Sequence, residues 1–208
     1  MIKRKKAISN LLQFTEALVA DAADIFTIFS DLVGSTEYKN RLVNLDLPDI
    51  VWIQRQLVFL TRCADIIRKY GGNVVKTIGD EVFAYFQATA DPIYILNCAI
   101  EIIQAFGNIK AYKGISEIHT KIAIDFGQVY NGSIDKIVLF DPIGVPVDRC
   151  ARLISLAKAD EIIFSKNFLE ICATKKEISE IQKKYGYKNE EMELKGLGKI
   201  SCYRFKAK

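Results

Sequence analysis

Two aspartates in this 208-residue chain stand where an apolar, strand-like run meets a glycine turn. The first is Asp31, which follows the run Ile25–Phe29 and precedes Gly34. The second is Asp80, directly after Gly79. Carboxylate oxygens are the ligands that hard cations such as Mg²⁺ prefer, and two such cations can hold a triphosphate. If the strands that carry the two aspartates are neighbours, the sequence predicts nucleotide chemistry.

Gly34, Ser35 and Thr36 follow Asp31 where the pattern predicts the start of a helix. Free backbone N–H groups and the helix dipole at such a start favour a phosphate. Taken singly, an aspartate like Asp31 is more often a helix N-cap, and a Gly-Asp pair is more often a hairpin turn. The order of these segments, together with a third one downstream, favours the catalytic interpretation.

That third segment, Gly144 to Leu153, carries Asp148 and Arg152 four residues apart, hence on one face of a predicted helix. The same spacing is typical of a weak surface salt bridge. However, Arg152 stands in an otherwise apolar segment, where a buried guanidinium without a partner is costly. We therefore predict that Arg152 points at charge that develops on a phosphate.

Composition predicts a globular protein of one domain. The net charge is +4 and 50% of the residues are hydrophobic, which does not suit a nucleic-acid binder with a dense basic stripe. No apolar run approaches the ~20 residues that a membrane helix needs. Five scattered cysteines without a CxxC pair predict reduced thiols in a cytoplasmic protein. With His119 as the single histidine, serine-triad and multi-histidine metal chemistries are excluded.

The elements that must position these residues follow a β-α-β-β-α-β order. Strands are predicted at 25–29, 73–77, 81–86, 120–126, 161–164, 192–194 and 201–205, and helices at 48–70, 91–106, 144–157 and 165–184. Gly127 is predicted to break a strand, so that residues 128–134 return antiparallel. The order predicts an α+β fold with a ferredoxin-like core, additional strands and helices, and helices on one face of a mixed sheet. Residues 1–23 are assigned to an N-terminal helical extension and 24–208 to a catalytic domain.

From about Ile25 to Phe205 the chain resembles the class III nucleotidyl cyclases. The family's first metal motif resembles Phe29–Thr36, its second resembles Lys76–Asp80, and its ribose and transition-state helix resembles Gly144–Leu153. The resemblance implies a class III cyclase domain that binds two divalent cations, Mn²⁺ or Mg²⁺.

By this resemblance, Asp31, Asp80 and the Leu32 carbonyl hold the metals. Arg152 is implied to stabilise transition-state charge, and Lys195 to contact a phosphate. The two positions that read the base are Lys76 and Asp141.

The implied reaction is intramolecular: the 3′-hydroxyl of a nucleoside triphosphate attacks its own α-phosphorus and releases pyrophosphate. In this family the metal ligands come from one domain, and the residues that contact the base and the transition state come from another. One such domain therefore implies a head-to-tail homodimer with active sites at its interface.

The base is an open question. Lys76 suits a ring nitrogen and Asp141 an exocyclic amine, which makes an adenylate cyclase the first alternative. The segment Val147–Arg152 and a predicted stand-alone domain are instead similar to bacterial pyrimidine cyclases of anti-phage defence, which make cyclic UMP or cyclic CMP for a separate effector. We favour that interpretation. Asp148 stands where most of the family has asparagine, and adjacent Arg149 is a candidate to compensate its charge.

Three further interpretations remain. Ile78–Phe83 resembles the hairpin of diguanylate cyclases, although Ile78 takes the place of a needed glycine. A non-catalytic nucleotide-binding module stays open because of Asp148, while both metal aspartates and Arg152 argue against it. An RNA-binding module of the same element order requires exposed aromatics on its central strands and a more basic face.

Overall fold

The computed structural model describes residues 22–107, 118–132, 140–172, 175–194 and 196–207. The predicted helical extension of residues 1–23 falls almost entirely outside the described residues. It and its boundary with the domain of residues 24–208 therefore stay predictions.

The described elements follow the predicted order. They are β1 (Ala23–Leu32), α2 (Ser35–Asn44), α3 (Ile50–Lys69), β2 (Asn73–Ile78), β3 (Glu81–Gln87), α4 (Pro92–Gly107), β4 (Thr120–Asn131), β5 (Pro142–Ile143), α5 (Val145–Leu156), β6 (Glu161–Ser165), α6 (Lys166–Cys172), α7 (Lys175–Tyr185), β7 (Lys188–Leu194) and β8 (Gly198–Lys206). The helical stretch predicted over 165–184 corresponds to α6 and α7, and the two residues between them lie outside the described ranges.

A single mixed sheet organises these elements, with the strand order β2-β3-β1-β4-β6-β8-β7. β1 lies between antiparallel β3 and β4, and β4 pairs with β6 in parallel. The first four strands with their helices form the ferredoxin-like core that the sequence predicts. The remaining strands extend the sheet on the β4 side, which confirms the α+β class.

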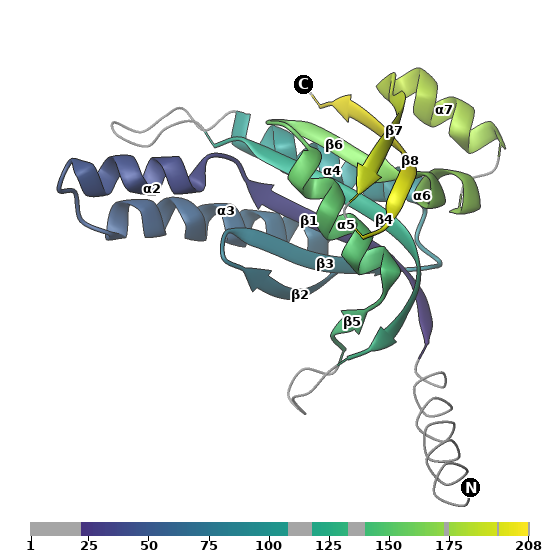
Figure 1. The fold of residues 1–208 in the computed structure, drawn as a ribbon, viewed down its shortest axis with the longest axis horizontal. Helices are drawn as coiled ribbons and strands as arrows, with labels where there is room; N and C mark the ends of the chain where they lie inside the picture. Colours follow the sequence, from purple (N-terminus) through teal and green to yellow (C-terminus); the bar gives the residue numbers. More distant parts are fainter. Residues whose placement is uncertain (1–21, 108–117, 133–139, 173–174, 195, 208) are drawn as a thin grey trace, which may run out of the picture.

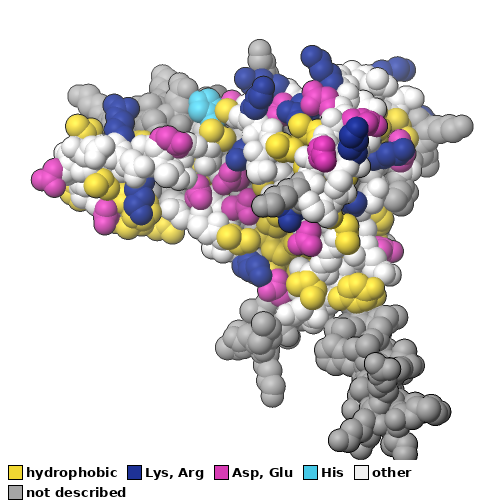
Figure 2. Space-filling model, in the orientation of Figure 1, with side chains coloured by type: hydrophobic (Ala, Val, Ile, Leu, Met, Phe, Trp, Pro, Cys, Tyr) yellow, Lys and Arg dark blue, Asp and Glu magenta, His cyan; other side chains and the backbone are white. Residues whose placement is uncertain are grey.

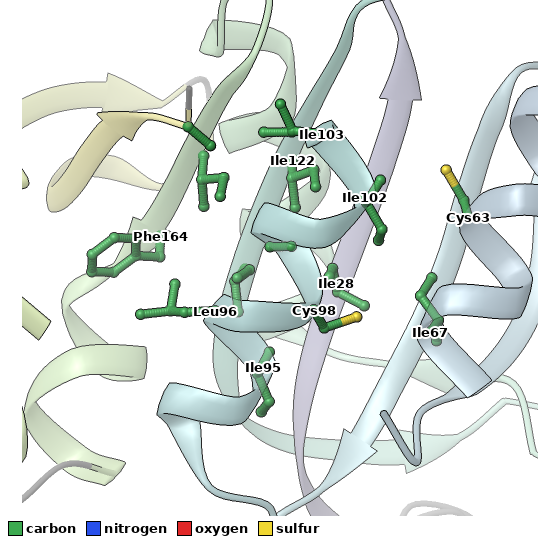
Figure 3. Packing of buried hydrophobic residues seen from close by; sticks show 14 of the residues in the cluster. Ile28, Cys63, Ile67, Ile95, Leu96, Cys98, Ile102, Ile103, Ile122 and Phe164 are labelled. Carbon is green, nitrogen blue, oxygen red and sulfur yellow. The ribbon is translucent and has the colours of Figure 1, made fainter. Parts of the chain in front are cut away.

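One face of the sheet carries the larger part of the core. α3, α4 and α6 pack there, and Figure 3 shows Cys98 and Ile102 of α4 beside Ile28 of β1, with Leu96 directed toward Phe164 of β6. α3 and α4 lie behind the sheet in Figure 1, so one face of β1 and β4 is buried against helices.

The opposite face is covered by α5, which crosses the sheet in front of β4 in Figure 1. Its Cys150 and Leu153 pack against Phe29 and Phe83 of the sheet. The prediction that helices cover only one face is therefore wrong. β1 is buried without interruption from Ile25 to Ser30, so both faces of this strand need an apolar cover.

β4 differs from its prediction as well. It runs through Gly127 as one strand to Asn131, where β5 pairs with it, so the predicted break and antiparallel return are wrong. A Cβ atom on Gly127 would lie 2.7 Å from Cγ of Pro146. The glycine therefore allows the start of α5 to approach β4 closely, and it does not end the strand.

Two smaller predictions concern the thiols and the membrane. Cys63, Cys98, Cys150 and Cys202 are buried free thiols, as expected from their apolar surroundings. Within the described ranges, no helix has both the length and the apolar character required to cross a membrane.

Candidate active site

Asp31 and Asp80 come together because β1 and the β2–β3 hairpin are neighbours in the sheet. Asp31 pairs across the strands with Glu81, and the Leu32 N–H donates to the Asp80 carbonyl over 3.4 Å. Two residues farther into the sheet, the rings of Phe29 and Phe83 stack with centroids 4.6 Å apart. The β1–β3 register thus places Asp31 next to the hairpin turn that carries Asp80.

A cavity of about 370 Å³ opens at this edge. It is lined by Asp31, Leu32, Val33, Gly34, Ser35, Thr36, Glu37, Asp80, Lys121, Ala157, Lys158 and Ala159. α2 begins at Ser35, after Gly34 in a left-handed conformation with φ of 69°, so the first N–H groups of the helix lie at the cavity. Figure 2 shows acidic side chains gathered on this face where α2 and α3 leave the body. One cavity is thus lined by the predicted metal ligands Asp31, Leu32 and Asp80 and by the predicted phosphate-binding residues 34–36.

Sequence reasoning missed two charged neighbours of Asp31. Glu81 faces it from β3 and Lys121 faces it from β4. The Lys121 Nζ lies 2.9 Å from Asp31 Oδ2, and both side chains are 20% exposed. The alternating pattern of Ile122 and Ile124 indicates that Lys121 faces the other side of the sheet from these isoleucines. The pattern does not indicate that Lys121 lies beside Asp31.

The carboxylates of Asp31, Asp80 and Glu81 lie close enough to affect one another's ionisation, and Lys121 is the lysine that pairs with Asp31. Burial raises the pKa of Asp31, and Asp80 raises it further, while the hydrogen bond from Lys121 opposes the shift. Burial, with the charges of Asp31 and Asp80, raises the pKa of Glu81 to about 7. Such crowding fits divalent cations, which prefer carboxylate oxygens and remove the repulsion.

A bound cation would need other ligands besides these side chains. Among the described residues, no three His, Cys, Asp or Glu side chains are grouped closely enough to hold a metal ion on their own. Magnesium sites commonly keep waters and substrate phosphates in the shell. Asp31 and Asp80 with the Leu32 carbonyl therefore fit a site that the substrate completes.

We expect Glu81→Gln to stabilise the metal-free protein at pH 8. Below pH 4.5 the Glu81 carboxyl is protonated in both the folded and the unfolded protein. Between pH 4.5 and about 7 it ionises only in the unfolded chain, so the free energy of unfolding falls as the pH rises. Above pH 7 the full destabilisation is present. Because the side chain is partly exposed, we expect about 1 kcal/mol, or roughly 2–4 °C in Tm. Thermal melts in chelator at pH 4.5 and 8 measure this; an equal gain at both pH values would contradict it.

Asp148 and Arg152, the predicted site residues of α5, lie outside this cavity. Pro146, Cys150 and Leu153 form the buried face of α5, whereas Asp148 and Arg152 are exposed. Arg152 is thus exposed although its neighbours in the sequence are apolar. Neither side chain lines the cavity of Asp31 and Asp80, although the residues directly after α5 do. The two halves of the predicted catalytic set are separate within one chain.

Arg149 does not compensate the charge of Asp148, contrary to the expectation from their adjacency. Its guanidinium turns to the sheet and pairs with Asp125 of β4, with Nη2 3.1 Å from Oδ1. Asp148 lies on the exposed face of α5.

The two positions that were predicted to read the base, Lys76 and Asp141, lie in contact. Lys76 Nζ lies 2.6 Å from Asp141 Oδ2 and 2.9 Å from Oδ1. Next to this pair, the rings of Tyr85 and Phe140 meet edge to face with centroids 5.1 Å apart. A donor and an acceptor therefore stand side by side next to aromatic side chains. Lys195, the predicted phosphate contact, lies outside the described residues.

Comparison with known proteins decides the family. Residues 19–207 match the family described as adenylate and guanylate cyclase catalytic domain. The chain belongs to this family. Asp31 and Asp80, which come from the two segments predicted to be metal motifs of such a domain, line the same cavity.

Relatives of the cyclase domain carry both purine specificities. An adenylate cyclase of Streptomyces coelicolor is 28% identical over 142 residues, which are 68% of this chain and 32% of that protein. The chain thus spans about a third of that relative. The guanylate cyclase domain of RhGC from Catenaria anguillulae, in complex with GTP, has a TM-score of 0.71 at 21% identity, covering 89% of this chain and 97% of that one. The adenylyl cyclase CyaB from P. aeruginosa has a TM-score of 0.72 at 21% identity, with coverages of 88% and 94%. At these identities the structures support the fold alone.

Proposed function

We propose that this cyclase domain works as a homodimer in which each active site combines two chains. One chain contributes the cavity with Asp31 and Asp80, and the other contributes Asp148 and Arg152 from α5 together with Lys76 and Asp141. The observation that carries the proposal is the exposure of Asp148 and Arg152 outside the cavity. A head-to-tail two-fold dimer generates two such composite sites.

The proposed reaction converts a nucleoside triphosphate to its 3′,5′-cyclic nucleotide and pyrophosphate. Two divalent cations, Mn²⁺ or Mg²⁺, supply charge neutralisation at the phosphates when bound. The N–H groups at the start of α2, with Lys121 and the proposed phosphate contact Lys195, bind the phosphate chain. Arg152 of the second chain stabilises the negative charge that grows on the phosphate oxygens in the transition state. Asp148 accepts a hydrogen bond from a ribose hydroxyl.

We further propose that the substrate is UTP or CTP and that cyclic UMP or cyclic CMP activates a separate effector in anti-phage defence. The support is the similarity of Val147–Arg152 to pyrimidine cyclases. The contact pair Lys76–Asp141 offers one donor and one acceptor, which can face the hydrogen-bonding edge of a pyrimidine as well as that of adenine. ATP is the second candidate, because the curated relative from Streptomyces coelicolor is an adenylate cyclase.

Complementation tests the two-chain site. Asp80→Ala and Arg152→Ala are each expected to inactivate the homodimer. When the two variants are mixed under exchange conditions, heterodimers regain one intact site, so turnover should return to about a quarter of the wild-type value.

A matched control mixes Asp80→Ala with Asp31→Ala. These substitutions remove the same half of the site, so this mixture should stay inactive. Full inactivity of both mixtures, with subunit exchange verified by native mass spectrometry, would contradict a site shared between chains.

A further inference from the structure

A charged side chain is buried in the middle of the sheet on the face that α5 covers. Asp125 of β4 is 0% exposed, and it is not part of the cavity with Asp31 and Asp80. A carboxylate removed from water needs hydrogen bonds and an opposite charge to be tolerated. Its partners therefore indicate what the buried charge holds in place.

Asp125 has partners on three elements. Arg149 of α5 donates from Nε to Oδ2 and from Nη2 to Oδ1, the latter over 3.1 Å. Ser165 at the end of β6 donates its hydroxyl to Oδ1, and the Phe126 N–H donates over 2.7 Å. Ser165 Oγ in turn accepts the Phe168 N–H at the start of α6 over 3.1 Å. Burial raises the pKa of Asp125, while the bonds from Arg149 and Ser165 oppose the shift.

The fork-shaped pair of Arg149 and Asp125 restricts how α5 can rotate. A guanidinium that bonds a carboxylate through two nitrogens has one favourable orientation, whereas aliphatic contacts such as that of Leu153 tolerate small rotations. Successive residues of a helix differ by about 100° around its axis. With Arg149 directed into the sheet, Asp148 and Arg152 must both lie on one flank of α5, within roughly 40° of each other.

Two further contacts hold the same helix against sliding. Pro146 lies against Gly127, where no Cβ fits, and Cys150 Sγ is 3.7 Å from the Thr27 carbonyl oxygen. Neither contact fixes the direction of the exposed face as a bidentate ion pair does. The Arg149 side chain is 15% exposed, so its pair with Asp125 is largely shielded from solvent.

We propose that Asp125 and Arg149 are positioning residues that set the rotation of α5 and thereby aim Arg152 at the active site of the other chain. The inference rests on the proposed two-chain site. In this role Arg149 acts through the helix that carries Arg152.

Arg149→Lys keeps the positive charge and loses the bidentate geometry. A misplacement of a catalytic group by about 1 Å can reduce the rate on the order of 100-fold. We therefore expect a reduction in kcat of about tenfold or more with a much smaller change in KM. Asp125→Asn, which keeps the shape of the side chain and an acceptor for Ser165, should act in the same direction and more weakly.

The decisive experiment uses heterodimers in which only one α5 is in use. Chains with two different affinity tags are co-expressed and isolated by tandem purification. In the reference heterodimer, the Asp80→Ala chain donates its α5 and the Arg152→Ala chain donates its cavity. Arg149→Lys is then added to one chain or to the other, and kcat, KM and Tm are measured for both heterodimers.

We expect kcat to fall only when Arg149→Lys is in the chain that carries Asp80→Ala. Each of the two heterodimers contains one Arg149→Lys chain, so a general loss of stability affects both alike and Tm should agree. Asp125→Asn is placed in one chain or the other of the same reference heterodimer, and its effect on kcat, KM and Tm provides a second test.

An equal loss in the two arrangements, or no loss in either, would overturn the positioning role. An inactive reference heterodimer beside an active wild type would instead refute the two-chain site itself. The two failures are thus distinguishable.

Discussion

Asp80→Ala is expected to reduce turnover by about 10³-fold or more, which corresponds to about 4 kcal/mol of transition-state stabilisation. Asp80 stands in the hairpin turn at the cavity that Asp31 also lines. Without its carboxylate, the site lacks a ligand for the divalent cations that neutralise the phosphates. The measurement is the rate of pyrophosphate release at saturating Mn²⁺.

The fold should survive this substitution, because Asp80 raises the pKa of both Asp31 and Glu81 through charge repulsion. We expect the Tm of the metal-free variant to equal or exceed that of the wild type. Asp65→Ala removes an exposed acid of α3 and serves as the control with unchanged turnover. Turnover of Asp80→Ala within a factor of three of this control would contradict the metal assignment.

Arg152→Ala is expected to lower kcat by about 10²–10³-fold while KM changes less, because its guanidinium meets charge that exists only in the transition state. The side chain is exposed on α5, so its removal leaves no buried cavity, and stability should be unchanged. Steady-state kinetics over a range of nucleotide concentrations separates the two parameters.

Arg68→Ala is the matched control, since Arg68 is an exposed helix arginine with only a 3.7 Å pair to Asp65. It should leave both kcat and KM unchanged. A rise in KM at constant kcat for Arg152→Ala would mean that Arg152 binds the ground state, contrary to a transition-state role.

Local signals were sufficient for much of the fold. β2 and β3 follow from their β-rich runs around Gly79 and Asp80, since Gly79 supplies the positive φ of 63° that the turn needs. α3 follows from its apolar period and the two glycines after Tyr70. These features depend on neighbours in the sequence, so a single chain reveals them.

Contacts between distant segments were beyond such signals. Lys121 meets Asp31 only because β4 pairs with β1 in one register, and no local pattern specifies that register. The period of α5 places Asp148 and Arg152 on one face but does not say whether that face is buried. Its orientation depends on Asp125, which lies 24 residues before Arg149.

Glycine was the most misleading residue type in this chain. Gly127 was expected to end a strand, yet β4 continues through it because Pro146 needs the space of the missing Cβ. A close approach by another element leaves the same glycine signal as a turn. Only the packed structure separates the two.

Incubation of the purified chain with Mn²⁺ and each of ATP, GTP, CTP and UTP in turn, with products identified by mass, tests the proposed reaction most directly. We expect metal-dependent release of pyrophosphate together with 3′,5′-cyclic UMP or 3′,5′-cyclic CMP. Cyclic AMP alone would retain the cyclase and refute the pyrimidine substrate. The absence of cyclic nucleotide and pyrophosphate from all four substrates would contradict catalysis by this chain.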